Sequence, residues 1–99
     1  MKLIKIRKDG QCAPCDFVEQ MLLSENIQVD EELKFLEPGV DTRIDNLLEQ
    51  INVMKVPVVL VADDEDKVLA HAVGMNFTEI LSVVKLYNEY KWFQRGIIF

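Results

Sequence analysis

The chain has 99 residues, which fits one domain with a single hydrophobic core. Hydrophobic residues make up 49% and charged residues 28%, a balance typical of a globular protein and not of a disordered chain. The net charge is −6 and no apolar run reaches the length of a membrane span, so we expect neither a nucleic-acid partner nor a membrane partner.

The N-terminal quarter predicts a strand followed by a helix. Residues 2 to 7 alternate β-branched and charged side chains, a strand pattern that Asp9-Gly10-Gln11 interrupts. From Ala13 to about Ser24 apolar residues recur at helical spacing and predict a helix with one inward face. These residues are Phe17, Val18, Met21 and Leu22.

The next segment predicts a second strand and a second helix. Residues 27 to 29 and 33 to 36 both alternate weakly, and we favour a strand around Glu32 to Leu36, before Glu37-Pro38-Gly39. Asp41 or Thr42 can cap the following helix. Its apolar stripe has helical spacing and consists of Ile44, Leu47, Leu48 and Ile51.

The C-terminal half predicts a hairpin and a closing helix. Val58–Ala62 is an apolar run that reads as a strand covered on both faces, and residues 67 to 73 return after the polar turn 63 to 66. Gly74 ends the hairpin. Asn76 to Glu79 has the form of a capping box, after which three apolar residues face the core. These are Ile80, Leu81 and Val84, and residues 91 to 99 form an apolar C-terminal tail.

This order of elements predicts an α/β domain. The sequence of strand, helix, strand, helix, strand, strand, helix (βαβαββα) gives a four-stranded mixed sheet with helices on both faces. We find no repeat or linker, so residues 1 to 99 form a single domain.

Both cysteines of the chain lie in the loop Cys12-Ala13-Pro14-Cys15, at the start of the first predicted helix. Unpaired N–H groups at a helix N-terminus favour a thiolate, so reversible dithiol–disulfide chemistry is the leading interpretation, with Cys12 as nucleophile and Cys15 more buried. A zinc site would need two more ligands, and the chain offers only His71. A structural disulfide would close too small a loop to remove much chain entropy.

Neighbouring side chains add less. Lys8 could stabilise a Cys12 thiolate, whereas Asp9 and Asp16 would oppose it. We expect His71 to be a half-buried structural residue. Met21 and Met54 are interpreted as packing residues.

The N-terminal residues do not resemble a signal peptide. Charged residues recur within residues 1 to 5, which leaves no apolar signal-peptide core, so we expect a cytoplasmic protein.

Three motifs together resemble the thioredoxin/glutaredoxin superfamily over residues 1 to 90. They are Cys12-Ala13-Pro14-Cys15 after the first strand, Val56-Pro57 before a β-branched strand, and Gly74 before the last helix. The resemblance implies a thioredoxin-like fold and a thiol–disulfide oxidoreductase. In that chemistry Cys12 attacks a substrate disulfide and Cys15 resolves the mixed disulfide.

The resemblance also implies a substrate groove beside the cysteines. Pro57 would have a cis peptide bond, and the backbone of Val56 would pair with an extended substrate segment. An ordinary trans proline at a strand start is the alternative. The remaining groove residues are Ala13, Pro14, Gly74 and Met75.

The chain departs from both branches of the superfamily. Gln11 replaces the tryptophan of thioredoxins, Ile6 stands where thioredoxins carry a buried acid, and Gly74 is not part of the Gly-Gly pair of glutaredoxins. The reductant, thioredoxin reductase or glutathione, therefore stays open, and we expect no bound cofactor beyond the redox-active disulfide. The substrate would be a disulfide-containing protein such as ribonucleotide reductase.

The alternative function is a non-catalytic binding or adaptor module. Its binding surface would be the groove or the tail, whose apolar residues mark a candidate interface. They are Trp92, Phe93, Ile97, Ile98 and Phe99.

Overall fold

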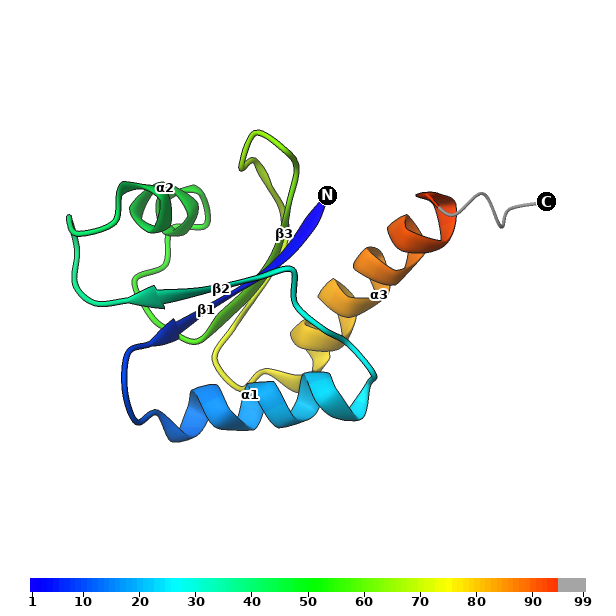
Figure 1. Ribbon diagram of the computed structural model, residues 1–99, viewed down its shortest axis with the longest axis horizontal. Helices are drawn as coiled ribbons and strands as arrows, with labels where there is room; N and C mark the ends of the chain where they lie inside the picture. The colour runs from blue at the N-terminus through cyan, green and yellow to red at the C-terminus, as the bar shows by residue number, and fades with distance from the viewer. Residues whose placement is uncertain (95–99) are drawn as a thin grey trace.

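The computed structural model describes residues 1–94 and contains four strands and three helices (Figure 1). In chain order these are β1 (Lys2–Lys8), α1 (Ala13–Ser24), β2 (Glu31–Phe35), α2 (Thr42–Gln50), β3 (Val58–Ala62), β4 (Val68–Val73) and α3 (Phe77–Gln94). The predicted order of elements is confirmed.

The four strands form one mixed sheet in the order β2-β1-β3-β4. β1 and β2 are parallel and joined through α1, whereas β3 is antiparallel to both β1 and β4. Ile6 is paired with Val58, and Val58 with Val73. The C-terminal end of β1, the start of β3 and the end of β4 therefore lie at the same end of the sheet.

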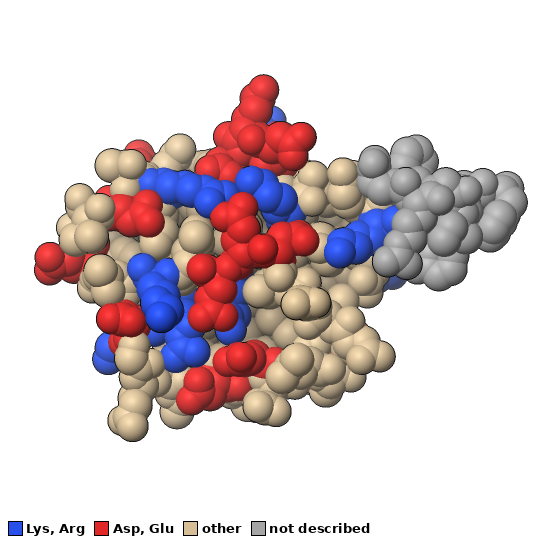
Figure 2. Space-filling view, in the orientation of Figure 1, with Lys and Arg blue, Asp and Glu red and all other residues tan. Residues whose placement is uncertain are grey.

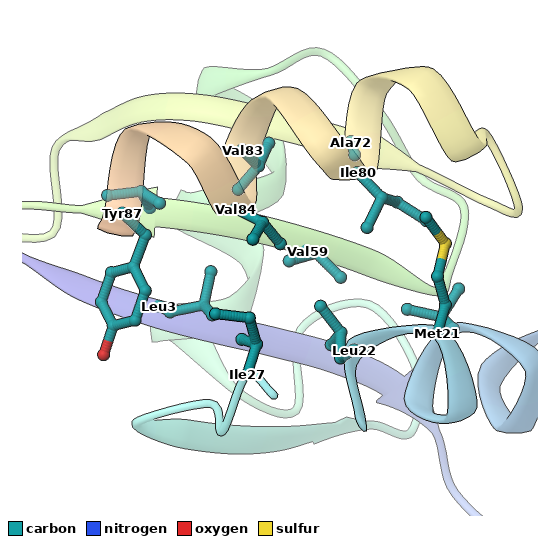
Figure 3. Packing of buried hydrophobic residues seen from close by; sticks show 12 residues of the cluster. Leu3, Met21, Leu22, Ile27, Val59, Ala72, Ile80, Val83, Val84 and Tyr87 are labelled. Carbon is teal, nitrogen blue, oxygen red and sulfur yellow. The ribbon is translucent and has the colours of Figure 1, made fainter. Parts of the chain in front are cut away.

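One face of the sheet packs against α1 and α3 (Figures 1 and 3). Figure 3 shows Met21 extending from α1 toward Ile80 of α3, above the sheet residue Val59. Leu22 and Tyr87 belong to the same buried cluster. Helices that share one apolar cluster in this way bury their inward faces on each other as well as on the sheet.

The other face is covered by α2. Ile44, Leu47 and Leu48 are fully buried against a second cluster that includes Ile6 and Leu60. Every residue of β3 is buried, because this strand is internal to the sheet and covered on both sides. The expected α/β architecture with helices on both faces is thus confirmed.

Local signals explain where the helices begin. The Asp41 side chain caps α2 by accepting hydrogen bonds from Arg43 N and Ile44 N. Asn76 Oδ1 accepts a hydrogen bond from Glu79 N at 3.1 Å, which is one half of the expected capping box.

The element boundaries differ from the predicted ones by small amounts. β2 is one residue earlier than expected, and β4 begins at Val68. The last helix continues to Gln94, so residues 91–94 are helical and do not form a separate tail. The remainder of the predicted tail, residues 95–99, lies outside the described part of the chain.

Three predictions about burial were wrong. Phe17 is 47% exposed, because it lies one residue and thus about 100° around the helix from the buried Val18. Met54 is exposed, since it follows α2 in the loop that leads to β3. His71 is exposed on β4, which is an edge strand of the sheet.

Within residues 1–94, no helix combines the length and the apolar character needed to cross a membrane.

Candidate active site

The predicted site residues come from three loops at one end of the sheet. The first loop follows β1 and carries the cysteines, the second precedes β3 and carries Val56 and Pro57, and the third follows β4 and carries Gly74. Because Ile6 pairs with Val58 and Val58 with Val73, these loops adjoin neighbouring strands at the same end of the sheet. The topology thus brings together segments that are about 60 residues apart in sequence.

Cys12 and Cys15 form a disulfide across the first turn of α1. Cys12 is the N-cap residue with extended backbone geometry, and its Sγ accepts a hydrogen bond from Cys15 N at 3.2 Å. Cys12 is half-buried, whereas Cys15 is completely buried. The expectation that Cys15 is the more buried cysteine is confirmed, and only Cys12 is accessible from outside.

The loop before β3 is joined to the loop after β4. The Val56–Pro57 peptide bond is cis, as expected from the resemblance, and Pro57 is buried. Gly74 N donates a hydrogen bond to Pro57 O at 2.8 Å. Gly74 has φ +67°, so a side chain at this position would strain the backbone even though no atom lies within 4 Å of an added Cβ.

Several apolar side chains are exposed at this end of the molecule. Ala13 and Pro14 are exposed in the first turn of α1, Val56 is half-buried, and Met75 is 54% exposed. Phe17 and Phe77 add two exposed aromatic rings at the start of α1 and of α3. The sequence did not indicate this role for Phe17, because its spacing also fits the buried stripe of α1.

Arg7, at the end of β1, contacts the cysteine loop and α1 together. Its Nε donates to Lys8 O at 3.1 Å and its Nη2 donates to Gly10 O at 2.9 Å. Its Nη1 lies 3.6 Å from Asp16 and 3.8 Å from Glu19. Sequence reasoning treated Arg7 only as a strand residue, although Asp16 and Glu19 are three residues apart on α1 and so share a face.

Lys5 is the one buried charged side chain in the described part of the chain, with 2% exposure. Its Nζ lies 3.6 Å from Glu19 and 3.2 Å from Glu32. A cavity of about 250 Å³ lies next to it, between α1 and the segment that leads into β2. Ile6 is buried on the opposite face of the sheet from Lys5, against α2.

The other charges expected near the cysteines are exposed. Lys8 at the end of β1 and Asp9 in the loop that follows are both exposed, and the Asp16 side chain is 65% exposed while facing Arg7. Among residues 1–94, no group of three or more His, Cys, Asp or Glu side chains is arranged to hold a metal ion.

No family model matches the chain, and no curated protein matches it either. The fold and this site define an α/β domain with a cysteine pair at disulfide distance at the end of a mixed sheet.

Proposed function

We propose that this protein is a thioredoxin-like thiol–disulfide oxidoreductase that reduces protein disulfides through Cys12 and Cys15. The observation that carries the proposal is the Cys12–Cys15 disulfide at the N-terminus of α1, with one accessible and one buried sulfur. In cytosolic proteins a C-x-x-C pair of this kind is more often catalytic than structural.

The dithiol form carries two electrons to the substrate. The Cys12 thiolate attacks one sulfur of the substrate disulfide, so a Cys12–substrate disulfide forms and the first substrate thiolate leaves and takes a proton. Cys15 then loses its proton and attacks Cys12 Sγ, which closes the Cys12–Cys15 disulfide and releases the second substrate thiol. The substrate disulfide is reduced to two thiols, and the protein dithiol is oxidised to the disulfide.

The geometry around Cys12 supports its role as nucleophile. Its sulfur caps α1 and accepts the N–H of Cys15, which is a favourable position for negative charge. Cys15 is buried, so it does not meet the substrate and reacts only with Cys12 Sγ of the mixed disulfide. This asymmetry supports attack by Cys12 and resolution by Cys15.

The proposed substrate is an extended segment of a disulfide-containing protein. Val56 lies directly before the buried Pro57, at the same end of the sheet as the cysteines, and its backbone is proposed to pair with the substrate as an added strand. The exposed apolar side chains of Phe17 and Met75 are proposed to add to the substrate contact. The proposed location is a reducing compartment, the cytoplasm.

The first prediction concerns the two cysteines. Cys12→Ser should abolish insulin reduction, whereas Cys15→Ser should lose turnover but retain attack, and so accumulate a mixed disulfide with the substrate. Insulin turbidity measures turnover, and mass spectrometry under non-reducing conditions detects the mixed disulfide.

The assay is run with each reductant separately. Thioredoxin reductase with NADPH forms one arm, and glutathione with its reductase and NADPH forms the other, so the active arm also identifies the electron donor. Cys12→Ser/Cys15→Ser serves as the matched inactive control. A folded protein that has free thiols, reduces no disulfide in either arm and traps no substrate as Cys15→Ser would refute the proposal.

A further inference from the structure

Arg7 is the side chain that joins the cysteine loop to the helix that begins with it. Two of its nitrogens donate to loop carbonyls, those of Lys8 and Gly10, and the third faces the carboxylates of Asp16 and Glu19. The side chain is only 15% exposed. Hydrogen bonds and ion pairs of a guanidinium that is largely removed from water are stronger than those of a fully solvated one.

These contacts control where Cys12 lies. Gly10 is only two residues before Cys12 and has φ +81°, a backbone conformation that other residues rarely adopt. By holding the Gly10 carbonyl, Arg7 fixes the path of the loop into α1. The Sγ atom of Cys12 can accept the hydrogen bond from Cys15 N only when the loop places Cys12 at the N-cap position of α1.

The charge of Arg7 acts in the same direction. Asp16 directly follows Cys15, and its carboxylate would oppose a thiolate at the start of α1. The ion pair with Arg7 compensates that negative charge. Removal of Arg7 would leave Asp16 uncompensated beside the cysteine loop, whereas Glu19 would keep its ion pair with Lys5.

We propose that Arg7 is a positioning residue that sets the stability of the Cys12 thiolate, by holding the loop at the helix N-terminus and by compensating Asp16. This inference rests on the proposed function for its biological meaning. Arg7 does not contact substrate in this scheme. It acts through the backbone of the loop and through the charge of α1.

The test measures the thiol itself. In the Cys15→Ser background, thiolate absorbance near 240 nm against pH reports the ionisation of Cys12 alone. Arg7→Gln should move this titration to higher pH and leave about threefold to tenfold less thiolate at a fixed pH below the midpoint. The rate of alkylation by iodoacetamide should fall with it.

The redox equilibrium gives a second readout in the protein with both cysteines. The reaction is protein disulfide plus two glutathione thiols giving protein dithiol plus glutathione disulfide. The protein thiolate exists only on the dithiol side, so at a pH above the Cys12 midpoints of both proteins Arg7→Gln should shift the equilibrium toward the protein disulfide by a similar factor.

Two further variants separate the mechanisms. Arg7→Lys keeps the charge but lacks the planar fork that reaches both carbonyls, so it should lie between the unaltered protein and Arg7→Gln. Arg43→Gln is the matched control, because Arg43 also makes several ion pairs but at the other end of the sheet. It should change stability and leave the Cys12 titration unchanged.

An unchanged titration and redox equilibrium in folded Arg7→Gln would overturn the proposal. An Arg7→Lys protein identical to the unaltered one would overturn the positioning role and leave only the charge. These measurements need no protein substrate, so the role of Arg7 can be confirmed even if the protein reduces no disulfide in the insulin assay. Likewise, disulfide reduction can be confirmed even if Arg7→Gln leaves the Cys12 titration unchanged.

Discussion

Tyr87 is the largest fully buried side chain of the described residues, and it is anchored by a single carboxylate. Its hydroxyl donates to Asp30 Oδ2 at 2.7 Å, and the same oxygen accepts Leu3 N at 2.8 Å. Asp30 N in turn donates to Leu3 O. One acidic residue before β2 thus connects α3 to the start of β1.

Replacement of this hydroxyl tests the anchor. Tyr87→Phe keeps the ring in the core but removes one hydrogen bond to a carboxylate, and it should lower the free energy of unfolding by about 1 to 2 kcal/mol at neutral pH. Urea unfolding followed by circular dichroism measures the change. A variant as stable as the unaltered protein would show that the bond contributes nothing.

The same substitution should alter the response to alkaline pH. Burial, and then the hydrogen bond and charge of Asp30, raise the pKa of Tyr87 above its ordinary value of 10.0. Since the folded-state pKa is raised, the stabilisation is complete below pH 10 and is lost as the unfolded chain ionises above it. Tyr87→Phe should flatten the decline in unfolding free energy above pH 10, measured in urea at several pH values.

Among the elements, α2 is attached to the sheet by a group of charges as well as by its apolar stripe. Arg43 of α2 binds the carboxylate of Glu31 at the start of β2 and that of Asp66 in the turn before β4. Lys2 lies 3.2 Å from Glu31 and adds a second cation. Figure 2 shows that acidic side chains gather on the hairpin between β3 and β4, so these cations lie beside a negative surface.

This group predicts a loss of stability in acid. The hydrogen bond from Arg43 is the main cause that lowers the pKa of Glu31 from 4.5 to about 2, and the pKa of Asp66 is lowered for the same reason. With lowered folded-state pKa values, the stabilisation is complete above about pH 5 and is lost as pH falls toward 2. Glu31→Gln should make the unfolding free energy less dependent on pH in this range.

Glu37→Gln is the control, because it removes the same charge from an exposed loop residue. It should preserve the acid dependence seen in the unaltered protein. If Glu31→Gln and Glu37→Gln give the same slope between pH 5 and pH 2, the ion-pair group does not stabilise the fold. Acid titration of urea midpoints measures both slopes.

Hydrophobic patterning predicted the elements well but not the polar contacts between them. The run Val58–Ala62 is apolar at every position, which predicts an internal strand covered on both faces, and the structure confirms this prediction. The burial of Lys5 was not predictable, because it depends on Glu19 and Glu32 being placed on either side of it by α1 and β2. The prediction that Phe17 is buried was wrong because helical periodicity alone does not define how wide the apolar stripe of α1 is.

At the scale of the whole molecule, two separate apolar clusters stabilise the domain, one on each face of the sheet. Cys15 is buried, but the disulfide closes a loop of only four residues at the start of α1. Closure of so short a loop restricts the unfolded chain little. The fold therefore does not depend on the state of the cysteines.

Oxidised and reduced protein should accordingly both unfold cooperatively. Their free energies of unfolding should differ by at most about 2 kcal/mol, the entropy that a loop of this size removes. Urea titrations with and without dithiothreitol, followed by circular dichroism, measure the difference. Unfolding on reduction alone would contradict the view that the disulfide is a reactive group and not a structural one.

Glu19 links the charges on β1 in a way that restricts how α1 can move. The same oxygen, Oε2, lies 3.6 Å from Lys5 Nζ and 3.8 Å from Arg7 Nη1. Rotation of α1 about its axis, or a slide along the sheet, would separate this oxygen from both cations at once. Glu19, one turn beyond Cys15, thus ties α1 to two cations of β1 through one oxygen, and a displacement of this turn across the sheet would break both ion pairs together.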